Sequence, residues 1–251
     1  HFNTEIVRLG EPIKNTQIAN YGDHKGRTGS YSGQYLFEGQ SIYTWCVPKY
    51  AGVDNEGLSQ WYLKDGSKTT DYSTASKAEN LFLCGEAIPD LYGGFGTKLS
   101  AYGVDLSVTF NYSIGGMGYD YGYAQMISNP TSTATGYNIH KDMYGAWTAT
   151  NPTSNIPRWM YGDNNTGSMS SRFLTDASYL TLQNINLGYT LPAKWVKKIG
   201  LASVRVYAAA DNLCYWSKRK GFDPRGSFSG AVRGNNYSPV RSISGGITIT
   251  L

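Results

Sequence analysis

The stretch VDLSVTFNYSI, residues Val104–Ile114, alternates apolar and polar residues without interruption. The apolar set is Val104, Leu106, Val108, Phe110, Tyr112 and Ile114, and the polar set is Asp105, Ser107, Thr109, Asn111 and Ser113. A period of two predicts a β-strand with one apolar and one polar face. Its length suits a strand that crosses a membrane, and its aromatic residues gather toward one end, as in a barrel's aromatic belt. A core strand of a soluble sandwich would show the same alternation.

Two further stretches extend this pattern. Tyr102-Gly103 predicts a two-residue hairpin turn, which places Ala101 opposite Val104 and continues the apolar face through Leu99, Thr97 and Phe95. At the C-terminus, Ile243, Gly245, Ile247, Ile249 and Leu251 alternate with serine, glycine and threonine. A chain that ends inside such a strand is typical of bacterial outer-membrane barrels, although their usual last residue is phenylalanine. The alternative is an edge strand of a soluble sheet.

Composition narrows the class of protein without deciding it. The chain has 21 Tyr, 30 Gly and 6 Trp in 251 residues, which suits a barrel with aromatic girdles and equally an extracellular carbohydrate-binding sandwich. No stretch approaches eighteen apolar residues, so no transmembrane helix is expected. The net charge of +4 is small and dispersed, which argues against nucleic acid as a partner. The start at His1, with no methionine or leader, indicates a cut end.

Alternation and turn residues predict seven long strands, near residues 2–9, 31–46, 94–101, 104–125, 179–191, 203–216 and 240–251. The connections alternate in length, with long ones near 47–93, 126–178 and 217–239 and short ones at 10–30, 102–103 and 192–202. An outer-membrane barrel has long loops outside and short turns in the periplasm. An open sheet of this kind would leave two bare edges in lipid, so missing upstream sequence or another chain must complete it.

Two local features keep alternatives open. The connection LPAKWVKKIGL, residues 191–201, forms either one amphipathic helical turn, with Trp195 at the interface and the lysines in water, or a plain turn with solubilising lysines. Cys46, Cys84 and Cys214 show no CxxC spacing. Three free thiols are favoured over a Cys46–Cys84 disulfide.

The sequence offers little for catalysis. In Gly226–Gly230 a phenylalanine, Phe228, occupies the nucleophile position of the GxSxG motif. The three histidines are isolated from other ligands, and the oxygen-rich stretch Asp163–Gly167 lacks the downstream glutamate of a calcium loop. We therefore expect no enzyme activity, no metal site and no cofactor.

Binding chemistry is better represented. The long connections carry aromatic and arginine side chains suited to stacking on sugars and hydrogen bonding, namely Trp61, Tyr62, Trp147, Arg158, Trp159 and Tyr161. For each of them the alternative is a structural one, in which the side chain anchors its own loop or contacts a partner protein. They are the candidate ligand-binding residues.

Three stretches narrow the class of protein further, namely RFLTDASYLTLQNINLGYTLP (172–192), VRVYAAADNL (204–213) and KGFDP (220–224). In this order they resemble the C-terminal region of SusC/RagA-like TonB-dependent outer-membrane transporters of Bacteroidetes. The hairpin segment 85–116 and the loops AWTATNPTSNIPR (146–158) and YAGVDNEG (50–57) are similar to motifs of the same family. The match covers about residues 45–251. It departs at the turn Ala101-Tyr102-Gly103 and at Leu251.

The resemblance implies an all-β fold, with this chain as about seven strands of a large antiparallel transmembrane β-barrel of about 22 strands. Residues 1–251 would be the C-terminal portion of that barrel, without its plug. Asp105, Ser107, Thr109 and Asn111 would face the lumen or the plug. The lipid-facing residues would be Val104, Leu106, Val108, Phe110, Tyr112, Ile114, Ile243, Ile247, Ile249 and Leu251.

The implied function is TonB-dependent nutrient uptake at the bacterial outer membrane. The implied partners are the rest of the barrel with its plug, a SusD-like surface lipoprotein, TonB acting on the missing N-terminal region, and the lipid bilayer. The implied substrate is an oligosaccharide or a peptide. The alternative is a secreted carbohydrate-binding β-sandwich without transport, and a hydrolytic enzyme is a weaker third hypothesis.

Overall fold

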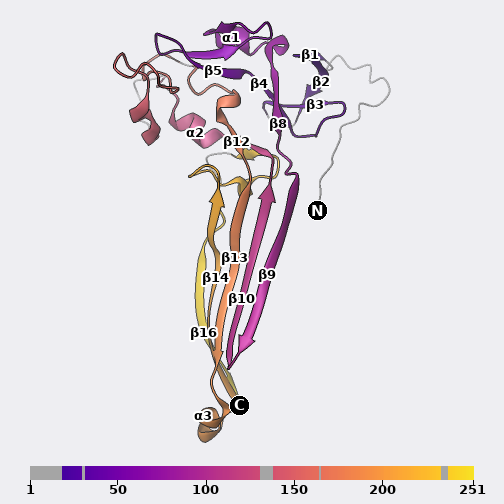
Figure 1. The fold of residues 1–251 in the computed structure, drawn as a ribbon, viewed down its shortest axis with the longest axis vertical. Coiled ribbons are helices and arrows are strands. Elements are labelled where there is room, and N and C mark those ends of the chain that lie inside the picture. The colour runs from indigo at the N-terminus through magenta and orange to yellow at the C-terminus, as the bar shows by residue number, and fades with distance from the viewer. Residues whose placement is uncertain (1–18, 30–31, 131–137, 164, 233–236) are drawn as a thin grey trace.

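The computed structural model of the protein describes residues 19–29, 32–130, 138–163, 165–232 and 237–251. It consists of a long sheet, the wall sheet, with a group of short elements at one end (Figure 1). We call that group the head; it comprises the described residues of 19–90, 115–178 and 218–241. Among the described residues, no helix is both long enough and apolar enough to cross a membrane.

The wall sheet has five strands, in the spatial order β16-β14-β13-β10-β9. Their bounds are β9 (Leu91–Ala101), β10 (Val104–Ile114), β13 (Tyr179–Thr190), β14 (Ser203–Ser217) and β16 (Ser242–Thr250). Each strand pairs antiparallel with its neighbours. The predicted hairpin is confirmed, because Val104 lies opposite Ala101 and Ile114 lies opposite Leu91.

The register gathers the apolar residues of all five strands on one face. On the rung of Leu106 lie Leu99 in β9, Leu187 in β13 and Ala208 in β14. The residues between them are mostly polar or glycine, with Ala209 of β14 as an exception, and lie on the opposite face. We call these two surfaces the apolar face and the polar face of the wall sheet.

The tight turn between β9 and β10 fixes that register. Tyr102 and Gly103 both have positive φ, at 52° and 84°. Two successive positive φ angles are those of a type I′ turn, whose twist matches the twist of the two strands. Glycine accepts this conformation freely, and the exposed Tyr102 accepts it at some steric cost.

A β-bulge interrupts the wall sheet halfway along β13. Gln183 has no rung partner in either neighbouring strand, and on β14 the register skips Asn212, which has a φ of 50°, and Leu213. Below the bulge the apolar residues of β13 have odd numbers, such as Ile185, and above it they have even numbers, such as Leu182. The extra residue therefore keeps the whole apolar set on one face.

The connection between β13 and β14 adopts the helical alternative. It forms α3 (Ala193–Val196), followed by the 3₁₀ turn η4 (Lys197–Ile199). Gly200 ends the turn in the left-handed conformation, at a φ of 78°, as a helix C-cap requires. Val196 is buried and anchors the turn at the end of the wall sheet remote from the head (Figure 1).

The head contains three small sheets. The first has the order β1-β2-β3-β4-β8 and is built of β1 (Ala19–Tyr21), β2 (His24–Thr28), β3 (Gln34–Phe37), β4 (Thr44–Val47) and β8 (Phe82–Glu86). The second consists of β5 (Lys49–Val53), β6 (Ser59–Tyr62) and β7 (Lys68–Thr69). The third places β11 (Met117–Asp120) between β12 (Leu174–Asp176) and β15 (Ala231–Val232), and its β11–β15 pair is parallel.

Short helices connect the strands of the head. They are α1 (Tyr72–Ala75), α2 (Tyr121–Met126), η1 (Ala78–Asn80), η2 (Lys141–Gly145), η3 (Ser171–Phe173) and η5 (Pro224–Gly226). Asp71 caps α1 and Asp120 caps α2, because each carboxylate accepts hydrogen bonds from backbone N–H groups of the first turn.

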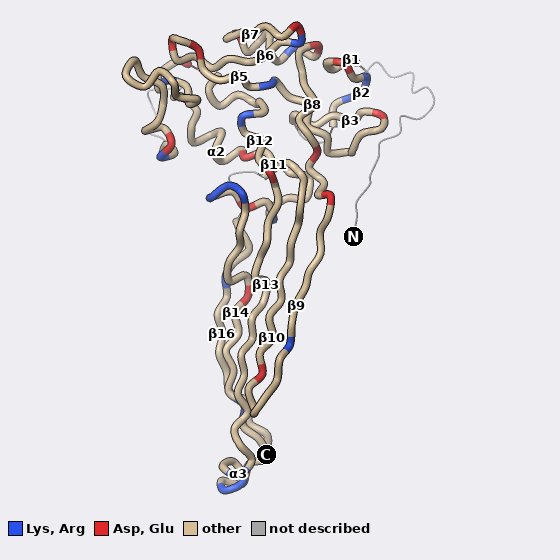
Figure 2. The backbone as a smooth tube through the Cα atoms, viewed as in Figure 1, with Lys and Arg blue, Asp and Glu red and all other residues tan. Residues whose placement is uncertain are grey.

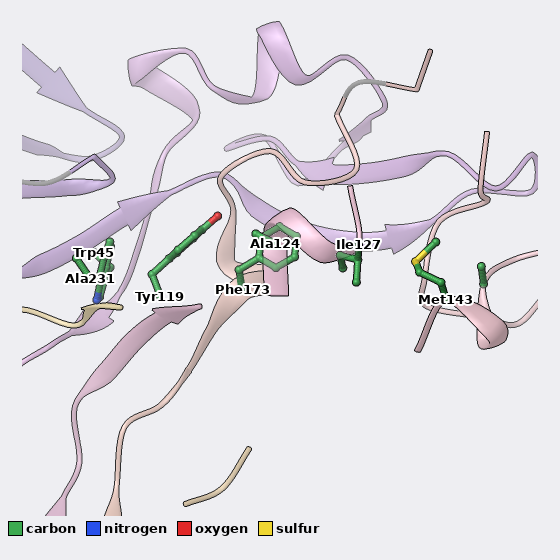
Figure 3. Close-up of a cluster of buried hydrophobic side chains, with 8 residues drawn as sticks. Trp45, Tyr119, Ala124, Ile127, Met143, Phe173 and Ala231 are labelled. Carbon is green, nitrogen blue, oxygen red and sulfur yellow. The ribbon is translucent and has the colours of Figure 1, made fainter. Parts of the chain in front are cut away.

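The head has its own hydrophobic core, drawn in Figure 3. Its members are Trp45, Tyr119, Ala124, Ile127, Met143, Ala146, Phe173 and Ala231. They come from segments far apart in the sequence, and the indole Nε1 of Trp45 donates to the carbonyl oxygen of Met117 at 2.9 Å. Full burial of a side chain such as Phe173 contributes about 1.5–3 kcal/mol to stability. This core stabilises the head separately from the wall sheet.

Two predicted strands are corrected by the structure. The strand predicted at 104–125 ends at Ile114, because Gly115 and Gly116 both take positive φ angles and turn the chain into the head. The strand predicted at 31–46 is divided into β3 and β4 by a turn at Glu38–Gly39. The strand predicted at 2–9 lies outside the described residues.

The three cysteines are free. Cys46 packs in a small cluster with Phe37 and Leu81, whereas Cys84 packs against the Trp45 core, so neighbouring strands direct the two thiols into different clusters. Burial raises the pKa of Cys46 to about 12, and burial also raises the pKa of Cys84. The structure therefore has the three free thiols that the sequence favoured.

Candidate functional site

The loops that carry the candidate ligand-binding residues lie against each other in the head. The backbone N–H of Arg158 donates to the carbonyl oxygen of Gly57 at 2.9 Å, and Arg158 Nη1 donates to the carbonyl oxygen of Glu56 at 3.1 Å. Gly57 has a φ of +85° and closely approaches the Trp147 ring, leaving no room for a Cβ atom. The structure thus brings the 54–62 and 146–163 segments together.

Arg158 mainly supports this arrangement. Its Nε donates to Asp163 Oδ2 at 3.0 Å, and both side chains are partly buried. The hydrogen bond to Asp163 raises the pKa of Arg158. The carboxylate of Asp163 therefore forms its ion pair with an arginine of the same loop.

The aromatic candidates divide by exposure. Trp61 is 1% exposed and packs edge-on against Tyr72 at 5.2 Å between ring centroids. Tyr62 and Trp147 are half-buried, and the ammonium groups of Lys49 and Lys68 lie over the Tyr62 ring. Trp159 is 44% exposed and Tyr161 is 57% exposed. Trp159 and Tyr161 are consequently the two candidates with aromatic surface open to a ligand.

A cavity at the junction of the wall sheet and the head was not anticipated from the sequence. It has a volume of about 360 Å³, and its lining includes Tyr43, Tyr92, Tyr179, Phe222, Arg225 and Phe228. Tyr92 and Tyr179 come from the polar face of the wall sheet, and Phe222 and Arg225 come from the loop after β14. The KGFDP motif marked that loop, but only tertiary packing brings it beside the strands.

Arg225 is held rigidly at the edge of this cavity. Its Nε donates to Asp223 Oδ1 at 2.8 Å and its Nη2 donates to Asp223 Oδ2 at 2.7 Å, while Nη1 reaches Thr181 Oγ1 at 3.2 Å. The guanidinium also lies over the Tyr215 ring at 4.4 Å. Burial tends to raise the pKa of Asp223, but hydrogen bonds from Arg225 and Ser238 outweigh it and leave that pKa lowered.

The polar face of the wall sheet carries its own side-chain network. Arg205 reaches across β13 to Asp105, with Nε donating to Oδ1 at 3.0 Å, and it passes over Gly188, where a Cβ atom would collide with the guanidinium. Higher up, Asn184 Nδ2 donates to Asp211 Oδ1 at 2.7 Å. Of the predicted lumen-facing set, Asp105 thus takes part in a cross-strand ion pair.

Aromatic side chains occupy both ends of the apolar face. Phe95 and Phe110 stack near the head, at 5.1 Å between ring centroids, with Tyr112 beside them. Tyr189 lies at the opposite end, on the rung of Val104. The two ends are eight residue steps apart along β10, from Val104 to Tyr112, which is about 27 Å along a strand and about 20 Å across a bilayer at the tilt of barrel strands.

No family model matches the chain. It is 28% identical to the TonB-dependent receptor P3 of Formosa agariphila over 225 residues, which cover 90% of this chain and 20% of that receptor. It is 27% identical to the TonB-dependent receptor P26 of the same organism over 234 residues, covering 86% of this chain and 23% of that receptor. The chain therefore spans about a fifth of the length of these relatives.

Solved structures show the same fold. The RagAB peptide importer in its open-open state matches with a TM-score of 0.69 at 25% identity, over 88% of this chain and 24% of that one. The closed-closed state matches with a TM-score of 0.72 at 24% identity, over 91% and 26%.

The wall sheet is therefore part of a large antiparallel transmembrane β-barrel. The chain is similar in sequence to a stretch of TonB-dependent receptors, and similar in fold to a stretch of the RagAB peptide importer.

Proposed function

We propose that the protein to which this chain belongs performs TonB-dependent nutrient uptake across the bacterial outer membrane, and that this chain supplies barrel wall and extracellular loops. One observation carries the proposal. The wall sheet has a continuous apolar face with aromatic ends. Among the described residues, the long connections meet in the head, and the opposite end carries the turn at 102–103 and the α3 connection. This asymmetry supports a head outside the cell and short turns in the periplasm.

The two faces then have different surroundings. The apolar face, including Val104, Leu106, Val108, Phe110, Tyr112, Ile114, Ile243, Ile247, Ile249 and Leu251, contacts lipid. The polar face, including Asp105, Ser107, Thr109 and Asn111, contacts the lumen or a plug that fills it. Cross-strand pairs such as Asp105–Arg205 satisfy charges there without exposing them to hydrocarbon.

The remaining barrel strands and the plug lie outside this chain in the proposal. Among the described residues, β9 and β16 each pair on one side only. An unpaired strand edge in lipid costs several kcal/mol for each unsatisfied backbone group. Further strands of the same barrel would satisfy both edges, and TonB would act through the plug.

The substrate is an oligosaccharide or a peptide that a SusD-like surface lipoprotein delivers to the head. The exposed aromatic rings of Trp159 and Tyr161 support contact with either class. The similar RagAB structures are those of a peptide importer, which favours including peptides in any screen.

Cysteine accessibility in cells that carry the full-length transporter tests the orientation. Tyr144 is exposed in the head and Tyr102 is exposed in the β9–β10 turn. A membrane-impermeant maleimide should label Tyr144→Cys on intact cells and Tyr102→Cys only after the outer membrane is permeabilised. The unsubstituted protein, with its own three cysteines, gives the background. Labelling of Tyr102→Cys on intact cells would refute the proposed orientation.

Substrate contact is tested by substitution in the same full-length protein. A screen of glycans and peptides against the intact complex identifies the ligand, and Trp159→Ala and Tyr161→Ala should then each weaken its binding by about 2- to 10-fold through loss of aromatic contact. Tyr144→Ala, which removes an exposed ring elsewhere in the head, is the matched control and should leave binding unchanged. Equal affinities in all four proteins would exclude these two rings from the ligand site.

A further inference from the structure

The turn between β13 and β14 places three lysines beside two exposed apolar side chains. Trp195 is 61% exposed and Ile199 is 69% exposed. The lysines, at positions 194, 197 and 198, are also exposed. Figure 2 shows this tip of the molecule in blue, at the end of the wall sheet remote from the head. Such a combination of bulky apolar and cationic side chains is unusual on a turn that has only water to contact.

The turn combines the two kinds of side chain within one short helical unit. Trp195 follows Lys194 in α3, and Ile199 follows Lys197 and Lys198 in the 3₁₀ turn η4, in which successive side chains lie about 120° apart. Val196 is buried and fixes how the turn is seated. The turn thus exposes apolar and cationic side chains together around one buried residue.

The lysines have no acidic partner within the described part of the chain. Lys64 and Lys218 form ion pairs elsewhere in the molecule, whereas Lys194, Lys197 and Lys198 form none with a described carboxylate. Asp105, which lies one rung from the β9–β10 turn at this end of the wall sheet, is already paired with Arg205. The turn therefore presents uncompensated positive charge.

The apolar face of the wall sheet reaches this turn. Tyr189, one residue before the end of β13, and Val206, near the start of β14, are neighbours on one rung and are both exposed. A lipid that contacts these residues is close to the lysines of the connection that joins their strands. This continuity favours a membrane lipid over an acidic protein as the partner.

We propose that Lys194, Lys197, Lys198, Trp195 and Ile199 form a binding site for an anionic phospholipid in the membrane leaflet at this end of the barrel. The ammonium groups bind the phosphate headgroup, Trp195 lies at the level of the headgroups, and Ile199 contacts the upper acyl chain. The inference rests on the proposed function, which puts this turn at the periplasmic surface.

Native mass spectrometry of the full-length transporter, reconstituted in nanodiscs of phosphatidylglycerol and phosphatidylcholine and then released, tests the site. Each lysine near an anionic surface strengthens binding about fivefold, so the triple variant Lys194→Gln/Lys197→Gln/Lys198→Gln should retain phosphatidylglycerol on the order of a hundredfold more weakly. The matched control changes three exposed lysines of the head, Lys25→Gln/Lys77→Gln/Lys141→Gln, and should retain the lipid like the unsubstituted protein. Trp195→Ala should weaken retention of both lipids.

Each other outcome overturns the proposal in an identifiable way. Equal retention of phosphatidylglycerol by the triple variant and the control would show that the turn does not bind it. Equal retention of both lipids by the unsubstituted protein would remove the requirement for a negative headgroup. If an impermeant reagent labels Lys198→Cys on intact cells, the orientation itself is wrong and the proposed function fails with it. Periplasmic labelling without lipid retention would overturn the lipid site alone.

Discussion

Replacement of Asp223 by alanine is expected to destabilise the loop between β14 and β16 by about 3–5 kcal/mol, because it leaves the guanidinium of Arg225 buried without its counter-charge. The two side chains are only 8% and 10% exposed, and the carboxylate also accepts the backbone N–H of Arg225. The measurement is native-state hydrogen exchange of the full-length protein in detergent, at the amides of Gly226, Gly230 and Val232. Their exchange should approach that of an open loop.

The control removes both charges. Asp223→Ala/Arg225→Met leaves no unpaired ion and should recover most of the protection that Asp223→Ala loses. If the double variant is as unprotected as the single one, the loss comes from packing and not from the buried charge.

The Asp223–Arg225 pair also makes the stability of this loop depend on pH. The pKa of Asp223 is lowered in the folded protein, so its contribution to stability is present above the pKa of an unfolded aspartate, about 3.9, and is lost as the pH falls through the folded value. Protection of this loop should therefore decline below about pH 4 in the unsubstituted protein and change less in the double variant.

The second large effect concerns the apolar face. Val108→Arg places a guanidinium near the middle of β10 on that face, and an arginine at the bilayer midplane costs about 2–4 kcal/mol in a barrel. We expect a corresponding loss in the free energy of unfolding of the full-length protein, measured by guanidinium chloride titration in phospholipid vesicles. This loss is the free-energy cost of transferring a charged side chain from water into hydrocarbon.

Thr109→Arg is the matched control, one residue further along the same strand. Thr109 belongs to the polar face and lies opposite Gly96, which leaves space for a longer side chain. Its substitution should change stability by less than about 1 kcal/mol. If the Thr109 variant is the less stable of the two, the assignment of lipid and lumen to the two faces is reversed.

The wall sheet could be predicted from the sequence because its information is local. The apolar alternation of β10, the two-residue turn at Tyr102-Gly103 and the repeat in β16 determine strand, face and register without reference to distant residues. Whether a residue number is odd or even is enough to assign its side chain to a face, since a strand with a period of two has only two faces.

The head could not be predicted in the same way. Met117, Tyr119, Tyr121 and Tyr123 form a second alternating run directly after β10, but the backbone at Gly115 and Gly116 turns the chain, and Tyr119 becomes a core residue of the head. The loop aromatics raise the same difficulty. Trp61 and Trp159 both lie in the long connections, but Trp61 is buried by packing against Tyr72 of α1 whereas Trp159 stays 44% exposed.

The bulge at Gln183 bears on how the length of such a chain can vary. Removal of one residue there would shift Leu180 and Leu182 onto the polar face and Thr181 onto the apolar one, so every rung between the bulge and the head would be inverted at once. Changes of length within the wall strands are therefore tolerated only in pairs, or as a single residue compensated by another at the same level. The head is free of this constraint, because its loops can lengthen by any number of residues while the wall strands keep their register. Variation in length among related chains should accordingly accumulate in the head and spare the interval from 179 to 190.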